Sequence, residues 1–312
     1  MIIINDIKDD HKIKPNGVFA IGNFDGIHLG HKEILENTKR ISSENNKPCG
    51  IIMFEPHPQK FFKMDSEGFY LSNLETKQYL LKPFDIDFFI VLAFDNEMAK
   101  RTPEEFVKDI IVNSFKASHV VVGYDFRFGS GRIGNANILQ EICSSLDIGV
   151  SIIEKQKRGN KILSSSIIRN YLSEGEIGLA EEMLGHRWAV KSKVVSGDKR
   201  GREIGFPTAN ILMKDWIKPK YGVYAVIVEF NRKIYKGVSN LGIRPTFDET
   251  VPILETYLFD FSGDLYDKDI IVSFVDFIRE EKKFDGVDSL RDQIEVDIIK
   301  AKKILSVIEL KD

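Results

Sequence analysis

The feature that most constrains the fold is a change of pattern near Gly185. Before that glycine, strand-like apolar runs alternate with helix-like segments, which is typical of a parallel sheet whose crossovers are helices. After it, strand-like runs follow one another with short turns between them, which favours an antiparallel sheet. A chain of 312 residues is long enough for two cores. We therefore predict two domains, residues 1–185 and residues 186–312.

The first domain is predicted to be a doubly wound, Rossmann-like α/β domain. We expect strands at residues 18–24, 50–54, 88–94, 120–123 and 150–153, and helices at residues 31–45, 103–115, 165–174 and 177–184. Thr102 precedes Pro103 as a helix N-cap would, and Gly175 and Gly185 suit left-handed C-caps. Ligands of such a sheet bind at the carboxyl ends of its strands.

The second domain is predicted to be an antiparallel β-barrel with a C-terminal helix. We expect strands at residues 188–195, 222–230, 233–238, 254–259 and 270–277, with turns at Asn231-Arg232 and at Ser262-Gly263-Asp264. Over residues 289–305, Leu290, Ile294, Ile298 and Leu305 recur at helical spacing. This segment is therefore expected to be an amphipathic helix that packs on the barrel.

Composition restricts the partners. A net charge of −3 and a pI near 6.1 provide no general attraction for nucleic acid or an anionic membrane, so we expect neither as a partner. The sequence has no apolar run of membrane-spanning length and no signal-peptide pattern, which predicts a soluble cytoplasmic protein. Cys49 and Cys143 have no metal-binding or redox spacing and are expected to be buried thiols. No obligate protein partner is evident.

A first candidate site follows the first long strand, at G-N-F-D-G-I-H-L-G-H (residues 22–31). Glycines let backbone N–H groups approach a ligand, and the N-terminus of the following helix favours an anion. His28 and His31 could therefore donate to phosphate oxygens. Two alternatives stay open from this motif alone: the histidines could simply cap the helix, or they could bind zinc, although a zinc site lacks further ligands of suitable spacing nearby.

Three other polar clusters follow strands of the same predicted sheet. They are Glu55-Pro56-His57-Pro58, then Tyr124-Asp125-Phe126-Arg127-Phe128-Gly129, then Ser164-Ser165-Ser166 with Arg169. Each could separately be a surface loop. Because the carboxyl ends of parallel strands meet at one edge of a sheet, we expect these clusters to converge on the histidine motif.

These motifs, in this order, resemble the adenylyltransferase module of the bacterial bifunctional riboflavin kinase/FMN adenylyltransferase (FAD synthetase) family. The H-x-x-H element alone implies only nucleotidyl chemistry, whereas N-F-D-G and D-F-R-F-G narrow it to flavin enzymes. The resemblance implies attack of an FMN phosphate oxygen on the α-phosphorus of ATP. It assigns ATP binding to Gly22, Asn23, Phe24, Gly26, His28, His31, Ser164, Ser165 and Arg169, with His28, His31 and Arg169 catalytic; it assigns flavin binding to Asn23, His57, Asp125 and Phe128.

The sequence departs from that family in two places. Ser166 stands where threonine is usual, which keeps the hydroxyl group. Asn135 stands where aspartate is usual, which puts any role based on charge at that position in doubt.

A second candidate site is the basic, glycine-rich loop of residues 197–210. Its composition is also that of an ordinary mobile surface loop. G-F-P-T-A-N, however, resembles the riboflavin kinase signature of the same family, as do G-V-S-N-L-G-I-R-P-T-F, L-E-T-Y-L-F-D-F and I-R-E-E-K-K-F. The resemblance implies ATP binding by Gly197, Lys199, Gly201, Gly205, Pro207, Thr208 and Asn210, and flavin binding by Arg244, Arg279 and Phe284.

Kinase chemistry needs a magnesium ion on the ATP phosphates, and a hydroxyl and an amide oxygen suit it. Thr208 and Asn210 lie two apart on a strand, so their side chains point to one face. Glu255 could be either a solvated carboxylate at a strand end or a general base. The resemblance makes it the base for a riboflavin hydroxyl, and it makes Thr208 and Asn210 the Mg²⁺ ligands.

The sequence therefore predicts an enzyme that converts riboflavin to FMN and then FMN to FAD, with ATP and Mg²⁺. Two alternatives are a nucleotidylyltransferase for another substrate with an accessory barrel, and a non-catalytic flavin-binding regulator. The G-F-P-T-A-N segment with Glu255 argues against the former, and the complete set of predicted catalytic residues argues against the latter.

Overall fold

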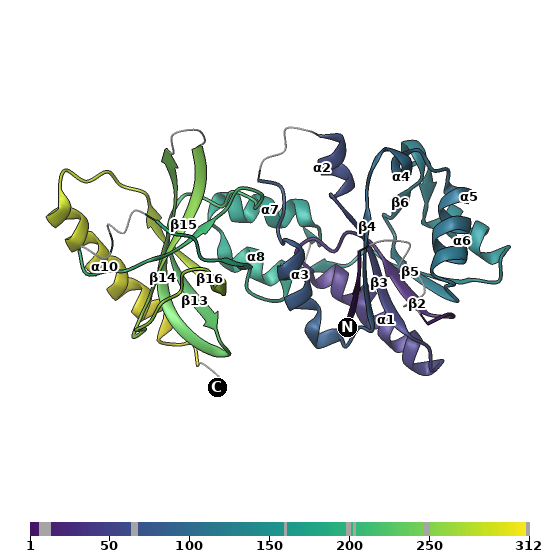
Figure 1. Ribbon diagram of the computed structural model, residues 1–312, viewed down its shortest axis with the longest axis horizontal. Coiled ribbons are helices and arrows are strands. Elements are labelled where there is room, and N and C mark those ends of the chain that lie inside the picture. Colours follow the sequence, from purple (N-terminus) through teal and green to yellow (C-terminus); the bar gives the residue numbers. More distant parts are fainter. Residues whose placement is uncertain are drawn as a thin grey trace. The chain divides into compact units, whose positions relative to one another are not determined.

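The computed structural model describes residues 1–5, 14–63, 68–158, 161–197, 201, 204–245 and 250–309. The chain forms two compact units, shown in Figure 1: Met1–Ser66 with Gln78–Leu163, and Glu67–Lys77 with Ser164–Asp312. The second unit thus includes a segment from the predicted first domain as well as residues 164–185. The predicted division at residues 185/186 separates two sequence modules, whereas these units are defined by contacts in space. The division therefore stays a prediction.

The first unit is built on a parallel six-stranded sheet in the order β1-β4-β3-β2-β5-β8. The strands are β1 (Ile2–Ile4), β2 (Val18–Ile21), β3 (Cys49–Glu55), β4 (Phe88–Ala93), β5 (His119–Gly123) and β8 (Gly149–Ile153), and every pairing is parallel. The predicted parallel sheet is confirmed. The strand expected to reach residue 24 ends at Ile21 instead, because the chain turns at Phe24, whose φ is 49°.

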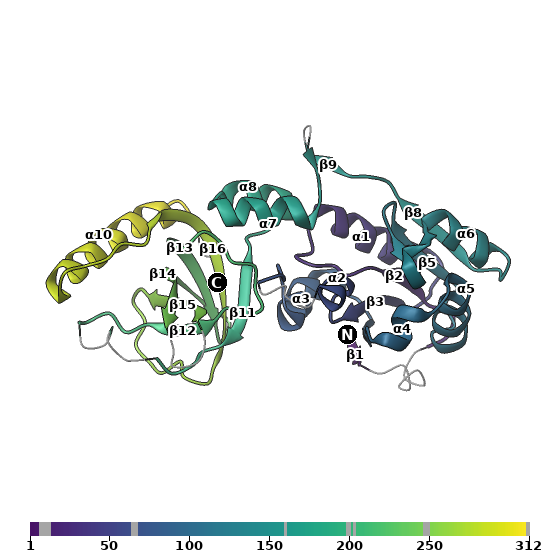
Figure 2. The same cartoon turned by 90° about the horizontal axis from the view of Figure 1, so that it is seen from above.

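Helices lie on both faces of this sheet. The helical segments are α1 (Leu29–Glu44), α2 (Pro58–Phe62), α3 (Leu74–Leu81), η2 (Lys82–Phe84), α4 (Asn96–Lys100), α5 (Pro103–Glu105), η3 (Phe106–Ser114), η4 (Ser130–Arg132) and α6 (Ala136–Ser144). The first half of α3, up to Lys77, belongs to the second unit. Apolar residues of η3 and α6, such as Ile110 and Leu139, share one core cluster with Phe19 and Ile52 of the sheet. In Figure 2, α1 lies on one side of β2 and α4 on the other. The predicted doubly wound arrangement is therefore confirmed.

The cap predictions hold. Thr102 forms a capping box with Glu105 at the start of α5. Gly175 and Gly185 end α7 (Ser165–Glu174) and α8 (Ile177–Leu184) with φ of 83° and 68°. Both helices have the bounds that the sequence predicts.

The second unit contains an antiparallel six-stranded sheet in the order β11-β16-β13-β14-β15-β12. Its strands are β11 (Ala189–Lys193), β12 (Ala209–Leu212), β13 (Gly222–Phe230), β14 (Lys233–Pro245), β15 (Thr250–Leu258) and β16 (Asp269–Glu280). An antiparallel bridge between Val195 and Asn210 links the chain just after β11 to β12, so the sheet nearly closes. The predicted barrel is confirmed, and β12 is the strand expected to carry Thr208 and Asn210, although it begins at Ala209.

The C-terminal helix α10 (Val287–Leu305) packs on the outer face of this barrel. Its Ala301 and Leu305 share a core cluster with Val223 of β13 and Val238 of β14. The opposite face of the same strands fills the barrel interior, where Leu241 is fully buried. The prediction of an amphipathic helix on the barrel is therefore confirmed.

Residues 68–77 are bonded into the second unit through backbone and side chains. Tyr70 donates its N–H to the carbonyl of Asp215 at 3.1 Å, and its own carbonyl accepts from Ile217 at 2.8 Å. The indole of Trp188 donates to the carbonyl of Leu71 at 2.8 Å. These contacts explain why this segment joins the second unit although it lies between elements of the first.

Candidate active sites

The first candidate site lies where the order of the parallel sheet reverses. From β2 the chain passes through α1 to β3 on one side, while β5 pairs with β2 on the other. In open α/β sheets, ligands bind at this switch point, outside the carboxyl ends of the two strands. The motif of residues 22–31 follows β2, Asp125 follows β5, and His57 follows the neighbouring β3. The topology thus brings these predicted residues of the first unit to one edge, as expected.

The turn between β2 and α1 has an unusual backbone. Phe24, Gly26 and Ile27 all have positive φ, at 49°, 79° and 43°. A positive φ is strained for residues with a side chain, and it persists only where packing holds it. Here the Phe24 and Ile27 side chains are fully buried, so they anchor the turn in the core.

His28 and His31 lie together at the N-terminus of α1. His28 is the N-cap, and its Nδ1 accepts from the backbone N–H of His31 at 3.2 Å. The two rings stack with centroids 3.6 Å apart. His28 thus caps the helix, as one of the alternatives for this motif requires. This cap is compatible with anion binding, because a helix N-terminus presents N–H donors and a positive partial charge.

Asn23 precedes this turn, and its side-chain amide oxygen, Oδ1, is buried without a hydrogen bond among the described residues. Buried polar atoms are normally paired, so an unpaired one needs an explanation such as an absent ligand. Asn23 is one of the residues predicted to bind both substrates.

The predicted flavin-binding residues of the first unit differ in their surroundings. His57 is nearly buried and caps α2, with its Nδ1 accepting from Gln59 N–H at 3.1 Å. Asp125 is exposed directly after β5. The Phe128 side chain instead belongs to the core cluster and packs on Phe126 with ring centroids 5.4 Å apart. The Phe128 ring therefore packs in the core under the loop, and flavin binding by this residue stays a prediction.

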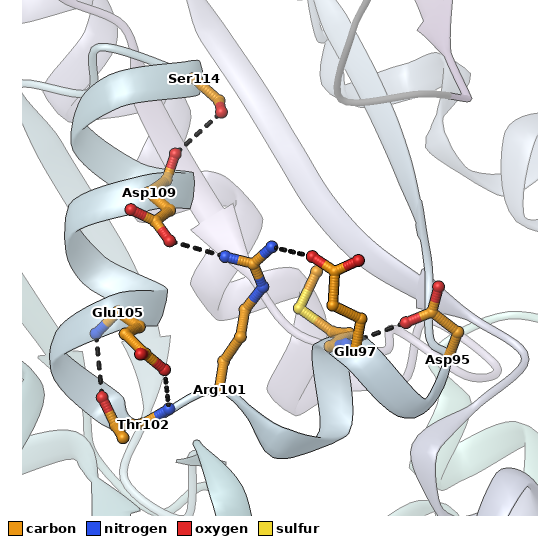
Figure 3. Close-up of polar contacts among 8 residues, drawn as sticks. Asp95, Glu97, Arg101, Thr102, Glu105, Asp109 and Ser114 are labelled. Atoms are coloured by element: carbon orange, nitrogen blue, oxygen red, sulfur yellow. Dashed lines mark hydrogen bonds and ion pairs between the residues drawn. The ribbon is translucent and has the colours of Figure 1, made fainter.

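The loop that carries Asp125 is fastened to the start of α5. Ser130 donates its N–H to the carbonyl of Arg101 at 2.7 Å. A Cβ on Gly129 would lie 2.9 Å from ring atoms of Pro103, so only glycine fits against that proline. Arg101 is itself held by Glu97 of α4 and Asp109 of η3, each at 2.7 Å (Figure 3). This ion-pair network fixes the point to which the loop is tied.

Asn135, where the family usually has aspartate, is the N-cap of α6. Its Oδ1 accepts from the N–H groups of Asn137 and Ile138 at 2.9 and 3.0 Å. Asparagine and aspartate cap helices about equally well, so the cap does not require the charge.

Ser164, Ser165 and Arg169 belong to the second unit. Ser164 is the N-cap of α7, with its Oγ accepting from Ile167 N–H at 3.4 Å. Arg169 donates from Nε to the carbonyl of Phe69 at 2.8 Å, and its guanidinium lies 4.3 Å from the centre of the Phe69 ring. Their role in ATP binding stays a prediction.

The second candidate site centres on a row of polar side chains across three strands. Glu255 of β15 is paired in register with Asn210 of β12 on one side and with Asn240 of β14 on the other. Residues directly opposite each other in antiparallel strands place their side chains on the same face. Asn240 is also paired with Val223, which packs against α10, so the row lies on the outer face of the barrel that α10 partly covers.

Asn210 resembles Asn23 in having a buried amide oxygen without a partner. Its Oδ1 makes no hydrogen bond within the described part of the chain, although the residue is only 5% exposed. Its Nδ2 side lies against Gly197, where a Cβ would clash. Thr208, half-buried just before β12, lies near Gly201, whose carbonyl accepts from Phe206 N–H at 2.7 Å.

Other predicted residues of this site are described only in part. Gly205 and Pro207 are exposed in the same loop, while Lys199 lies outside the described residues. Arg244 is described only as a backbone position of β14, paired with Val251. Asn240 of β14 is not among the predicted site residues, and its place beside Glu255 follows from strand register alone.

Arg279 joins the barrel to α10. Its guanidinium forms a bidentate pair with Asp297, with contacts of 2.6 to 3.0 Å, and both side chains are largely buried. Its guanidinium carbon lies 6.0 Å from the centre of the Phe284 ring. Arg279 thus has a structural role beside Phe284, and flavin binding by the two residues stays a prediction.

Within the described ranges there is no cluster of three His, Cys, Asp or Glu side chains that could hold a metal ion, and no helix long and apolar enough to cross a bilayer. A magnesium site that uses a hydroxyl, an amide and nucleotide phosphates does not need such a cluster.

Comparison with known proteins covers both units. Residues 10–167 match a family model described as FAD synthetase, and residues 184–305 match one described as riboflavin kinase. A bifunctional riboflavin kinase/FMN adenylyltransferase of Buchnera aphidicola is 36% identical over 99% of this chain and 100% of its own. Its namesake in Bacillus subtilis is 37% identical over 92% of this chain and 93% of its own.

A solved structure has the same fold over nearly the whole chain. It is titled a macrolide-efflux protein from Streptococcus pneumoniae, it is 30% identical, and it superimposes with a TM-score of 0.82 over 97% of this chain and 99% of that one.

Proposed function

The chain belongs to the bifunctional riboflavin kinase/FMN adenylyltransferase family, and from that premise we propose which of its residues carry each step. The protein is a transferase that phosphorylates riboflavin to FMN with ATP, then adenylylates FMN to FAD and releases pyrophosphate. The match of residues 184–305 to the riboflavin kinase model favours this function over a nucleotidylyltransferase with an accessory barrel.

In the kinase step, Glu255 is the general base. It removes the proton from the terminal ribityl hydroxyl of riboflavin while that oxygen bonds to the γ-phosphorus of ATP, and ADP leaves with the bond electrons. The observation that carries this assignment is the register of Glu255 beside Asn210. A base must lie within reach of both the acceptor hydroxyl and the phosphate site, and this pairing provides that position.

Magnesium fits the residues beside Glu255. The buried, unpartnered Oδ1 of Asn210 is a hard oxygen of the kind that Mg²⁺ prefers. The Thr208 hydroxyl lies two residues earlier in the chain and is expected on the same face. Bound there, the ion would neutralise phosphate charge that builds up during transfer. Gly197 lets the Asn210 amide pack directly against the loop backbone, because a Cβ there would collide with its Nδ2.

In the adenylyl step, His28 and His31 hold the ATP phosphates at the N-terminus of α1. FMN supplies the attacking phosphate oxygen, and the bond from the α-phosphorus to the pyrophosphate oxygen breaks. The N–H groups of the first turn and the imidazoles would stabilise the charge that moves onto pyrophosphate. Asn23 and His57 lie at the same sheet edge, and Asp125 follows β5, where FMN would enter the site.

We also propose that the enzyme works in the cytoplasm on small molecules alone. Its net charge of −3 offers nucleic acid or anionic lipid no general attraction.

Variants with single defects test the assignment of residues to steps. Glu255→Gln should abolish FMN formation from riboflavin and leave FMN-to-FAD conversion within about twofold of wild type, because the base serves only the kinase step. His28→Ala should do the reverse. Glu295→Gln, an exposed change on α10, is the matched control and should leave both rates unchanged.

Each step is assayed separately by chromatography of the flavins. If either variant stops both steps while its unfolding transition matches that of wild type, the assignment of the two sites is wrong.

A further inference from the structure

The polar row of the second unit contains one side chain to which no role has been assigned. Asn240 is half-buried, and neither of its amide atoms takes part in a hydrogen bond within the described part of the chain. Because the residue is only half-buried, water or a bound ligand can pair with this amide, as such polar groups normally require.

The position of Asn240 relative to Glu255 and Asn210 is set by strand register. Asn210 and Asn240 flank Glu255 from opposite sides, on β12 and β14. Directly opposed residues of antiparallel strands have Cβ atoms about 5 Å apart. The two amides therefore lie close to the Glu255 carboxylate, on its two opposite sides across the sheet.

In phosphoryl transfer, one of these two directions leads to the nucleotide and the other to the acceptor alcohol. The attacking oxygen and the leaving oxygen lie roughly in line, on opposite sides of the transferred phosphorus. On the proposed function, Asn210 marks the nucleotide side of Glu255, because its amide oxygen binds the magnesium ion. The alcohol substrate must then extend from Glu255 in the other direction, toward β14.

Gly242, two residues beyond Asn240 on the same face of β14, lies beside the Glu281 carboxylate. It has no side chain, and a Cβ there would lie 3.4 Å from the Asn240 Nδ2 and would collide with the Glu281 carboxylate. Gly242 thus lets the Glu281 carboxylate approach the strand next to the Asn240 amide, which is itself only half-buried. The same face continues through Val223 to Arg279 and α10, where flavin contacts are expected.

We propose that Asn240 is a substrate-binding residue of the kinase step, whose side-chain amide hydrogen-bonds an inner hydroxyl of the ribityl chain and so aligns the terminal hydroxyl with Glu255. An amide can both donate and accept, which suits a hydroxyl partner. This proposal rests on the assignment of Glu255 as the base.

Asn240→Ala and Asn240→Ser should raise the KM for riboflavin about fivefold to tenfold, the effect expected for one lost hydrogen bond. The KM for ATP should change by less than about twofold, because the amide lies on the acceptor side. FMN-to-FAD conversion should not change. Lys233→Ala, an exposed change on the same strand, is the control, and thermal unfolding of every variant verifies that it is folded.

Riboflavin analogues that each lack one inner ribityl hydroxyl give a readout that a purely structural role would not move. Wild-type enzyme should disfavour one of these analogues by about fivefold to tenfold, and Asn240→Ala should lose that discrimination while retaining the others.

Glu255→Gln serves as the reference that separates the two proposals. If Glu255→Gln loses phosphorylation but both Asn240 variants keep a wild-type KM for riboflavin and wild-type discrimination, the role of Asn240 is refuted and that of Glu255 stands. If Glu255→Gln phosphorylates riboflavin normally, both assignments fail.

Discussion

The ion pair between Arg279 and Asp297 is predicted to hold α10 on the barrel, and Asp297→Asn tests this. The carboxylate makes three contacts of 2.6 to 3.0 Å with the guanidinium and accepts from Gln293 at 3.0 Å. The Asp297 and Arg279 side chains are 4% and 13% exposed, so the substitution leaves a guanidinium without its counter-charge in a mostly dry site.

Removing one partner of a buried ion pair costs about 3 to 5 kcal/mol. The lower end applies here, because Arg279 keeps a bond to the Glu280 carbonyl at 2.7 Å and retains some exposure to water. We expect a loss of about 3 kcal/mol in the free energy of unfolding of the second unit. With a urea m-value of about 2 kcal/mol per molar, the midpoint should fall by roughly 1.5 M.

Tryptophan fluorescence reports this unfolding selectively. The chain has two tryptophans, Trp188 and Trp216, and both are buried in the second unit. The double variant Arg279→Met/Asp297→Leu should recover most of the lost stability, since apolar residues of similar size replace a buried pair at little cost. A midpoint shift below about 0.3 M for Asp297→Asn, or a double variant less stable than the single one, would refute the reasoning.

Three further predictions concern the first unit. Burial, and secondarily the charge of Lys47, lowers the pKa of His119 below 6.5. The stability of the first unit should therefore be greatest above pH 6.5 and fall as the pH drops toward the folded-state pKa. In His119→Gln, the midpoint of thermal unfolding followed by circular dichroism should depend less on pH over this range. Asn135→Ala should cost about 1 kcal/mol through loss of the α6 cap, whereas Asn135→Asp should be nearly neutral in the same assay. Arg101→Met should raise the KM for FMN in the adenylyl step at least threefold by loosening the loop after β5, with riboflavin phosphorylation unchanged; equal effects on both steps would contradict this.

Local signals predicted much of this fold correctly. The bounds of α7 and α8 agree because each ends at a glycine whose positive φ the C-cap requires. The Asn231-Arg232 turn was predictable for a similar reason, since both residues have positive φ in a tight hairpin. The parallel sheet followed from alternating strand and helix patterns.

Features that depend on distant parts of the chain were not predictable. Nothing in the local sequence of residues 67–77 indicates their hydrogen bonds to Trp188 and Asp215. Only the tertiary structure assigns this segment to the second unit. The burial of Phe128 likewise follows from its contact with Phe106, 5.4 Å away between ring centroids. An aromatic residue in a motif has the same sequence pattern whether it binds a ligand or fills a core.

The predicted site residues occur in contiguous motifs, which a single sequence shows directly, whereas the position of Asn240 beside Glu255 follows only from strand register. Cross-strand neighbours are set by pairing, which a single sequence does not specify well.

The most direct test of the central claim is a time course of the whole protein with riboflavin, ATP and magnesium. We expect FMN to appear first and FAD to follow, with one ADP and one pyrophosphate released for each FAD, because a phosphoryl and an adenylyl transfer each consume one ATP. Riboflavin that remains unchanged, or FMN that accumulates without any FAD, would contradict the account.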